Sequence, residues 1–547
     1  MITLRLFSLL FAFSLILTSV RAAEAPSALE HGNGRVILVG DSITGHSRNR
    51  KDGYAYRIEE ALHAVYPGST PEVIALGGSG QSVGSWASVE KRSREQKTML
   101  DIPNIDAHEA LSQPADVLII MLGMNDVIAP YVNASDEALQ RWSQQYAALI
   151  AALRERVHPK ELALASIPLC TEDLQSPKNR LIAAMNEQIK ALAAKENARY
   201  LPVFEEMAET LRRGRDIRPD FNLSPDFVHP AGTGHLAIAI AMLRGIGEDA
   251  AARWLAENPL QAALEQAAKG QPPLSWELME VRRVDEGDRF EFKVRYAWRG
   301  EPADANVRLT ASEGWTVEPA AAKGARGEFI LKGTPDRMAN RFTLEGEAGG
   351  EKSTVTGSIA APWLVAAGLE EPAWNNNDLD EAKAHNDIDT AIEAQQPFLE
   401  LPPKAGKEPL QWVACIPSVN FMGGAGPGNL DFSAVTHAKT FEAGYALRWI
   451  YSPQEQEYPL ELGTRIFAGN VHLRVWLNGA SIYNGQINKE QGHKTRRTVT
   501  LRKGWNELAI KSNHRAWLWQ YSVDFINPEG AAADDLRVRI TPPPPTP

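Results

Sequence analysis

The chain has 547 residues, 44% of them hydrophobic and 23% charged, a globular composition that excludes a largely disordered protein. At roughly 150 residues per domain, this length predicts three to four domains. The formal net charge of -11 argues against nucleic acid or an anionic membrane surface as the main partner.

The first segment, residues 1–22, is predicted to be a secretory signal peptide. Arg5 precedes an apolar run at 6–20, and small residues follow where a cleavage site needs them. The run is shorter than the ~20 apolar residues of a membrane-spanning helix, so no membrane span is expected. We therefore expect a secreted or periplasmic protein in which Cys170 and Cys415 are buried thiols without a bridge.

Residues 34–265 alternate short apolar strands with amphipathic helices. The expected strands are almost continuously apolar, as buried parallel strands are, and lie at 35–39, 72–76, 116–122 and 161–167. The expected helices lie at 135–157, 179–198 and 234–255. This alternation predicts an α/β fold, with a parallel sheet covered by helices on both faces.

Two β-rich regions follow a glycine- and proline-rich break at residues 270–273. Residues 274–362 alternate polar and apolar side chains in short strands and are expected to form a β-sandwich. A linker at 361–372 and a second β-rich region at 370–540 follow. The proline-rich end, residues 541–547, is expected to be extended.

Four loops of the α/β region carry residues suited to catalysis. They contain Ser42 in Gly-Asp-Ser, the glycines of 77–80, Asn125 in Gly-Met-Asn-Asp, and the pair Asp226 and His229. Taken singly, each loop has an ordinary interpretation as a turn, a flexible loop or a helix cap. The first three follow strands whose carboxyl ends meet at one edge of a parallel sheet, where α/β proteins place their sites.

Asp226 and His229 are three residues apart, so the carboxylate can fix the tautomer of the imidazole. A neutral His229 can then take the proton of Ser42 while Asp226 stabilises the imidazolium. Glycine lets a backbone N–H point at a reacting group, and Asn125 can point its amide toward the same edge.

Together the four blocks resemble the SGNH hydrolases, also called GDSL esterases and lipases, over roughly residues 34–255. The resemblance implies a flavodoxin-like α/β/α sandwich and ester hydrolysis through an acyl-enzyme. It also implies that Ser42 is the nucleophile, His229 the general base and Asp226 the residue that orients it.

The implied oxyanion hole consists of the N–H of Ser42, the N–H of Gly80 and the side chain of Asn125. One position departs from the family, because Ala75 stands where its glycine loop usually has asparagine, and the choice among the loop glycines stays open. No phosphate loop or metal cluster is recognisable, so neither a cofactor nor a metal is expected.

A second serine, Ser82, is an alternative nucleophile because it lies in the Gly-x-Ser-x-Gly pattern of α/β-hydrolase elbows. An elbow needs its strand to run almost into the first glycine, whereas residues 77–79 intervene here. Choosing Ser82 would also leave the other motifs without a role. His46 and His235 flank the motifs and are expected to be loop and helix-start residues.

The β-rich regions resemble accessory modules of secreted carbohydrate-active enzymes. Residues 313–319 are similar to immunoglobulin-like modules, and 475–479 and 503–508 to jelly-roll, galactose-binding-like domains. The alternating rings of Trp517, Trp519 and Tyr521 share one face of a strand. An exposed row would stack on sugars, but we expect these rings, with Trp449, Trp476 and Trp505, to form a core.

The motifs therefore predict a secreted serine esterase. Analogy with the β modules favours a carbohydrate O-acetylesterase, with an acetylated carbohydrate as substrate. A secreted lipase, lysophospholipase or thioesterase is the alternative among enzymes, and an apolar acyl tunnel would favour it. A glycan-binding protein with a vestigial hydrolase domain is the alternative of another class.

Overall fold

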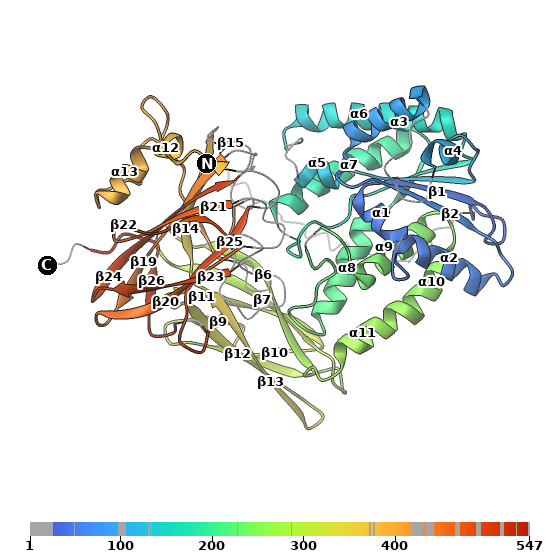
Figure 1. Cartoon of the computed structure of the whole chain (residues 1–547). Coiled ribbons are helices and arrows are strands. Elements are labelled where there is room, and N and C mark those ends of the chain that lie inside the picture. Colours follow the sequence, from blue (N-terminus) through green and yellow to red (C-terminus); the bar gives the residue numbers. More distant parts are fainter. Residues whose placement is uncertain are drawn as a thin grey trace, which may run out of the picture.

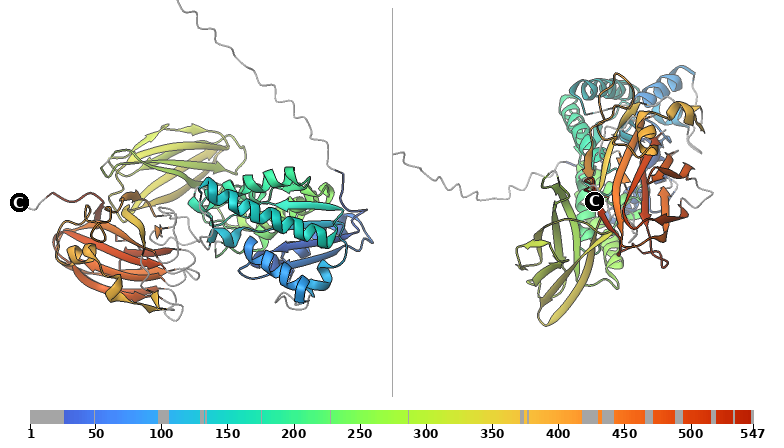
Figure 2. Two further views of the ribbon diagram at one scale, coloured as in Figure 1. Left: turned by 90° about the horizontal axis from the view of Figure 1, so that it is seen from above. Right: turned by 90° about the vertical axis from the view of Figure 1, so that its left-hand side faces the viewer.

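The structure is a computed structural model that describes residues 26–48, 50–96, 106–128, 132, 134–174, 176–226, 228–285, 287–370, 374–375, 378–417, 430–432, 442–464, 471–487, 494–514, 519–531 and 533–544. Figure 1 shows an α/β part, which holds the first half of the chain, beside two β-rich parts. The second part lies against both of the others in two further views (Figure 2).

The first part is built on a parallel sheet. Its described strands lie in the order β2-β1-β3-β4-β5, with bounds β1 (Arg35–Gly40), β2 (Glu72–Gly77), β3 (Val117–Met121), β4 (Glu161–Ala165) and β5 (Arg199–Leu201). This order is that of flavodoxin-like folds, and it confirms the predicted fold class. Strand β5 was not predicted, because its three residues are too few to give an apolar run.

Helices cover both faces of this sheet, with α3, α6 and α7 on one and α2, α9 and α10 on the other (Figure 1). Their bounds, with those of the remaining helices, are α1 (Ser42–Arg48), α2 (Tyr54–Val65), α3 (Val83–Gln96), α4 (Ala107–Leu111), α5 (Met124–Ile128), α6 (Asp136–Val157), α7 (Pro177–Lys195), α8 (Val203–Arg215), α9 (Gly232–Gly245), α10 (Asp249–Leu255), the π-helical η1 (Ala256–Leu260) and α11 (Gln261–Ala268). The single helix expected at 234–255 is divided because Gly247 takes a φ of 83° between α9 and α10.

The second part consists of two antiparallel sheets. One has the order β6-β7-β11-β9 and the other β10-β8-β12-β13, with bounds β6 (Leu274–Arg283), β7 (Phe290–Trp298), β8 (Asn306–Ala311), β9 (Thr316–Glu318), β10 (Ala322–Lys323), β11 (Arg326–Gly333), β12 (Ala339–Ala348) and β13 (Glu351–Ala360). Every second residue of β7 is buried from Phe290 to Tyr296, as the alternation in the sequence predicts.

The third part also pairs antiparallel sheets. The larger runs β17-β14-β19-β24-β21-β22, with β26 beside β19, and the smaller runs β18-β25-β20-β23. Their bounds are β14 (Trp363–Glu370), β17 (Val413–Cys415), β18 (Leu430–Asp431), β19 (Glu442–Ser452), β20 (Gln456–Thr464), β21 (Val471–Leu477), β22 (Ala480–Gln486), β23 (Lys494–Leu501), β24 (Gly504–His514), β25 (Gln520–Phe525) and β26 (Arg537–Arg539), and a small hairpin pairs β15 (Trp374–Asn375) with β16 (Asp378–Leu379). The linker expected at 361–372 is therefore wrong, because its apolar run pairs with β19 as strand β14.

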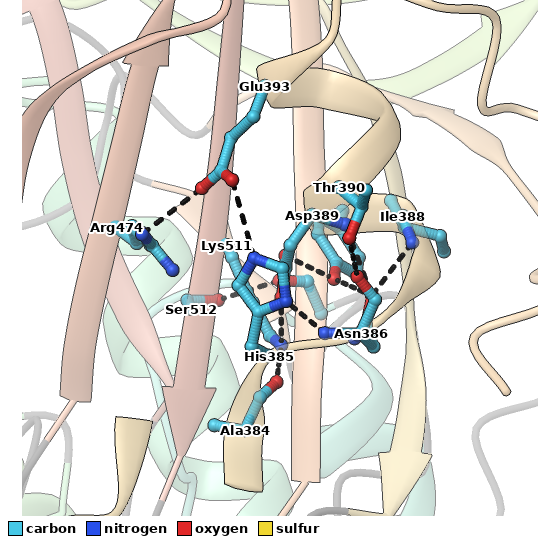
Figure 3. A network of polar contacts seen from close by, with 12 residues as sticks. Ala384, His385, Asn386, Ile388, Asp389, Thr390, Glu393, Arg474, Lys511 and Ser512 are labelled. Carbon is cyan, nitrogen blue, oxygen red and sulfur yellow. Dashed lines mark hydrogen bonds and ion pairs between the residues drawn. The ribbon is translucent and has the colours of Figure 1, made fainter. Parts of the chain in front are cut away.

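Two short helices, α12 (Glu381–Ala384) and α13 (Asp387–Glu393), lie on this third part and were not predicted. Asn386 and Asp389 form a capping box at the start of α13. Asp389 also receives hydrogen bonds from Lys511 at 3.0 Å and from Tyr445 at 2.7 Å, and Figure 3 shows this network against the strand of Lys511. Helices this short have little periodic signal and depend on such contacts.

Most of the aromatic side chains that were expected to form a core of the third part are buried. Trp476, Trp519 and Tyr521 have no exposed surface, and Trp449 is 7% exposed. Trp505 is partly buried against the hydrophobic cluster that contains Trp449 and Trp476. Trp517 lies outside the described residues. The core interpretation therefore holds for Trp449, Trp476, Trp519 and Tyr521, whose rings are buried.

Cys170 is buried and Cys415 half-buried, and no disulfide joins them. The predicted signal peptide lies outside the described residues. In the described part of the chain, every helix is too short or too polar to cross a bilayer.

Candidate active site

Ser42 lies where β1 meets α1. A Cβ on Gly40 would collide with the side chain of Thr44, so only glycine fits at the end of the strand. Asp41 caps the helix by accepting the N–H of Ile43 on Oδ1 at 2.9 Å. Ser42 is the first residue of α1, where an N–H has no partner within the helix and is available to a negatively charged atom.

Ser42, His229 and Asp226 form a hydrogen-bonded chain. His229 Nε2 lies 2.8 Å from Ser42 Oγ, and His229 Nδ1 lies 2.7 Å from Asp226 Oδ2. The second oxygen of Asp226 accepts the N–H of Val228 at 3.0 Å and that of His229 at 2.6 Å. The structure thus brings Ser42 to residues 184 and 187 positions further along the chain, in the arrangement of a nucleophile, a base and an orienting carboxylate.

The electrostatics favour an ionised Asp226. Burial raises the pKa of this carboxyl, but hydrogen bonds from the ring and N–H of His229 outweigh that effect and lower it overall. An ionised Asp226 accepts the Nδ1 proton of His229, which leaves Nε2 as the acceptor facing Ser42.

His46 packs against His229, with 4.7 Å between the ring centroids. Burial lowers the pKa of His46 and the neighbouring His229 lowers it further, so His46 is neutral near pH 7. It lies in α1 rather than in the expected loop. The signal for this contact was its position four residues after Ser42, on the same helix face.

His235 lies in the first turn of α9, as expected, and is 1% exposed. Burial lowers its pKa to about 4. His235 is therefore a neutral residue of the core, with its ring 5.8 Å from that of Tyr54, rather than a proton carrier at neutral pH.

Two buried carboxyls support the loops around Ser42. Burial raises the pKa of Asp41 to about 7 and that of Asp126 to about 6. Asp126 Oδ2 accepts the N–H of Val83 at 3.1 Å. This contact ties α5, the short helix after β3, to the start of α3.

Asn125 also connects two loops. Its Nδ2 donates to the backbone oxygen of Gln81 at 3.0 Å, and the residue is 8% exposed. Gly80 adopts a φ of 72°, which favours glycine. The structure thus places Asn125 directly against the glycine loop, and the amide has a second N–H that can face a ligand.

Ser82 has a different environment from Ser42. It precedes α3, and its Oγ accepts the N–H of Ser85 at 3.2 Å and lies 3.3 Å from the hydroxyl of Ser85. Five residues separate the end of β2 at Gly77 from the first residue of α3, Val83. Ser82 is thus a helix-start residue, and the geometry favours Ser42 as nucleophile.

Among the residues that the structure describes, no three or more His, Cys, Asp or Glu side chains are grouped to hold a metal ion. A polar pocket in the third part is lined by residues that include His472, Arg474 and Lys511, but its cavity of about 10 Å³ has room for one water. The Ser42 cluster is therefore the candidate active site.

Comparison with known proteins identifies the type of domain that carries Ser42. Residues 38–237 match the GDSL-like lipase/acylhydrolase family. The first part of the chain is a GDSL-like lipase/acylhydrolase domain. The resemblance inferred from the four motifs is confirmed, and the GDSL domain makes the protein a serine carboxylic ester hydrolase.

A curated relative of the GDSL domain is an acetylxylan esterase from Geobacillus stearothermophilus, 26% identical over 232 residues, which cover 40% of this chain and 95% of the relative. A crystal structure of an acetylxylan esterase from that organism is 25% identical and covers 39% of this chain and 94% of its own, with a TM-score of 0.31. An α/β hydrolase from the metagenome of Lake Arreo is 19% identical over 40% of this chain and 96% of its own, with a TM-score of 0.31.

Proposed function

We propose that this protein is a carbohydrate O-acetylesterase whose catalytic residues are Ser42, His229 and Asp226. The observation that carries the proposal is the chain of hydrogen bonds of 2.8 Å and 2.7 Å through the two nitrogens of His229. Export by a cleaved signal peptide, residues 1–22, is part of the proposal.

Acylation begins when Ser42 Oγ attacks the ester carbonyl carbon while its proton passes to His229 Nε2. Asp226 keeps the proton on Nδ1 and stabilises the imidazolium. The carbonyl oxygen becomes an oxyanion, which we assign to the N–H of Ser42, the N–H of Gly80 and the amide of Asn125. His229 then gives its proton to the oxygen of the leaving alcohol, and the acyl group remains on Ser42.

Deacylation repeats these steps with water. His229 takes a proton from the water as its oxygen attacks the acyl carbon. The bond to Ser42 Oγ then breaks, and His229 returns the proton to that oxygen. The products are the free alcohol of the substrate and the carboxylic acid, and the enzyme is restored.

Acetylated carbohydrate is supported as the substrate by two observations. The curated relative that matches the GDSL domain carries the name acetylxylan esterase. The two β-rich parts that follow consist of antiparallel sheets, and by analogy we take them to be accessory modules of an enzyme that acts on polysaccharides.

The decisive experiment compares p-nitrophenyl acetate, butyrate and longer acyl esters, and then acetylated xylan and pectin, with the wild type and Ser42→Ala. We expect preference for acetyl esters, release of acetate from polysaccharide, and a loss in Ser42→Ala of at least about 10³-fold in kcat. Ser82→Ala is the matched control and should keep its activity.

Each alternative has its own outcome in this experiment. Activity confined to long acyl chains would replace the proposal with a lipase or lysophospholipase. Binding of the polysaccharide without hydrolysis by the wild type would favour a glycan-binding protein. Equal activity of Ser42→Ala and wild type would overturn the assignment of the nucleophile.

The export proposal is tested separately. N-terminal sequencing of the protein recovered from the medium or periplasm should show a chain that starts just after residue 22. Recovery of the uncleaved chain from the cytoplasm alone would contradict it.

A further inference from the structure

A backbone hydrogen bond joins the two ends of the loop that carries Asp226 and His229, residues 223–231. The N–H of Ala231 donates to the backbone oxygen of Leu223 at 2.7 Å. The position of Leu223 therefore determines where the two catalytic side chains of this catalytic loop lie relative to Ser42.

Glu172 holds the start of the catalytic loop. It lies in the segment after β4 and is 3% exposed. Its Oε1 accepts the N–H of Leu223 at 3.0 Å and that of Ser224 at 2.8 Å. This single oxygen thus anchors the loop through two backbone hydrogen bonds, which are strongest when the carboxyl is ionised.

Arg215, the last residue of α8, favours that charge. It is 6% exposed, and its Nη2 donates to the backbone oxygen of Glu172 at 2.6 Å. Burial raises the pKa of Glu172 overall, and the positive charge of Arg215 opposes this rise in part. Arg215 thus links the end of α8 to the residue that holds the catalytic loop.

The counter-ion of Arg215 comes from the β-sandwich of the second part. Arg215 Nη1 lies 2.6 Å from Oε1 of Glu277 in β6, and the two side chains are 7% and 5% exposed. The other oxygen of Glu277 pairs with Arg295 of β7 at 2.9 Å. A buried guanidinium that loses its carboxylate is strongly destabilised, so Glu277 fixes where Arg215 can lie.

We propose that Glu277 of the β-sandwich positions the catalytic loop through Arg215 and Glu172. The second part of the chain thereby helps to determine the geometry of the active site. Glu172, Arg215 and Glu277 are positioning residues, since none of them touches the reacting atoms. The inference rests on the function proposed above, because the loop geometry sets a rate only if Asp226 and His229 are catalytic.

The test uses the full chain with Glu277→Gln and Glu172→Gln, which keep the size of the side chain and remove its charge. For p-nitrophenyl acetate we expect kcat to fall about 10- to 100-fold with little change in KM, because small displacements of catalytic groups cost this much. The acid limb of the kcat/KM profile should move to lower pH, since a displaced Asp226 supports the imidazolium of His229 less well.

The matched control is Arg326→Gln. Arg326 pairs with Asp216 at the same interface, and its side chain is 65% exposed, so this substitution leaves the buried pair of Arg215 and Glu277 intact. This variant should keep both kcat and the acid limb. The charged and titratable groups around His229 are Asp226, His46, Asp41 and His235, and all three variants leave them in place.

Unchanged kcat and an unchanged acid limb in both Gln variants would overturn the inference. If thermal unfolding shows that Glu172→Gln does not fold, Glu277→Gln decides alone, because Glu277 lies outside the hydrolase domain. A wild type without Ser42-dependent hydrolysis would refute the proposed function and this inference together. An active wild type with unchanged variants would refute this inference only.

Discussion

At the scale of single residues, the two nitrogens of His229 contact groups that require opposite states of protonation. Nε2 lies 2.8 Å from a hydroxyl whose proton it must accept, and Nδ1 lies 2.7 Å from a carboxylate that must keep a proton in place. The ring of His46 lies beside this base and is neutral, so it adds no charge that would repel the imidazolium. The surroundings of His229 therefore accommodate the positive charge of its own imidazolium. A second positive charge beside it would repel that imidazolium.

Replacing His46 with arginine tests this electrostatic argument. A fixed positive charge beside His229 disfavours its protonation, so the acid limb of kcat/KM should move to lower pH by about one unit. The measurement is the pH–rate profile for p-nitrophenyl acetate at low ionic strength. His46→Phe keeps a ring without a charge and should leave the limb in place; an equal shift in both variants would contradict the argument.

Asp41→Asn tests the cost of burying a carboxyl under Ser42. Because burial raises the pKa of Asp41 from 3.8 to about 7, the folded protein keeps a proton there that the unfolded chain has released. The free energy of unfolding should therefore decrease as pH rises through this window, by at most about 4 kcal/mol. An asparagine at this position does not titrate, but its side-chain oxygen can still accept the N–H of Ile43.

The measurement is the free energy of unfolding by denaturant, for the wild type and for Asp41→Asn, between pH 4 and 7. The difference in free energy of unfolding between wild type and Asp41→Asn should change steadily in favour of the variant as pH rises. Parallel curves for the two proteins would show that Asp41 is not protonated in the folded state.

At the scale of elements, the nucleophile depends on contact between the end of β2 and the start of α1. A Cβ on Gly77 would lie 2.5 Å from the backbone oxygen of Asp41 and would also collide with the N–H of Gly45. Both contacts are backbone atoms of α1 or its cap, which cannot rotate away. The glycine at the end of β2 is thus needed for packing, whether or not the glycine loop also contributes to the oxyanion hole.

Gly77→Ala should therefore shift α1 and reduce both stability and activity. Overpacking of this kind costs about 1–3 kcal/mol, and displacement of Ser42 should lower kcat by about tenfold or more. The control is Gly84→Ala in α3, where a Cβ meets no atom within 4 Å. That variant should be as stable as wild type or slightly more, because alanine favours a helix; equal effects of both substitutions would contradict the packing argument.

At the scale of the whole molecule, buried ion pairs join segments that are far apart in sequence. Arg215 and Glu277 join the hydrolase domain to the β-sandwich. Lys511 of β24 and Asp389 of α13 are paired at 3.0 Å with 3% and 1% exposed. Neither pair can be solvated where it lies, so each position depends on its partner.

Lys511→Met should destabilise the third part by about 3–5 kcal/mol, because Asp389 would be left as a buried charge without its partner. Thermal unfolding should show an early transition for this part, while hydrolysis of p-nitrophenyl acetate at 25 °C stays close to wild type. Lys494→Met removes a pair whose lysine is 64% exposed and should cost no more than about 1 kcal/mol. Similar losses in both variants would contradict this account.

The prediction of the fold from sequence succeeded where local pattern and burial agree. β1, β3 and β7 were recognised because apolar runs or strict alternation mark them. The expected linker at 361–372 failed because its proline and glycine residues obscured the apolar run of β14. α13 was missed because its stability comes from contacts with β19 and β24 rather than from its own seven residues.

The sequence by itself determined that Ser42, Gly80, Asn125 and the Asp226–His229 pair follow strand ends or begin a helix, since each motif is local and the ends of parallel strands share one edge. Only the tertiary structure decided that His46 packs against His229, that Trp476, Trp519 and Tyr521 are buried, and that Glu277 pairs with Arg215. These contacts join residues from separate elements, and their energies depend on burial and on a counter-ion supplied from elsewhere in the chain. A local pattern contains neither quantity, which is why the candidate catalytic residues could be proposed from the sequence and the residues that support them could not.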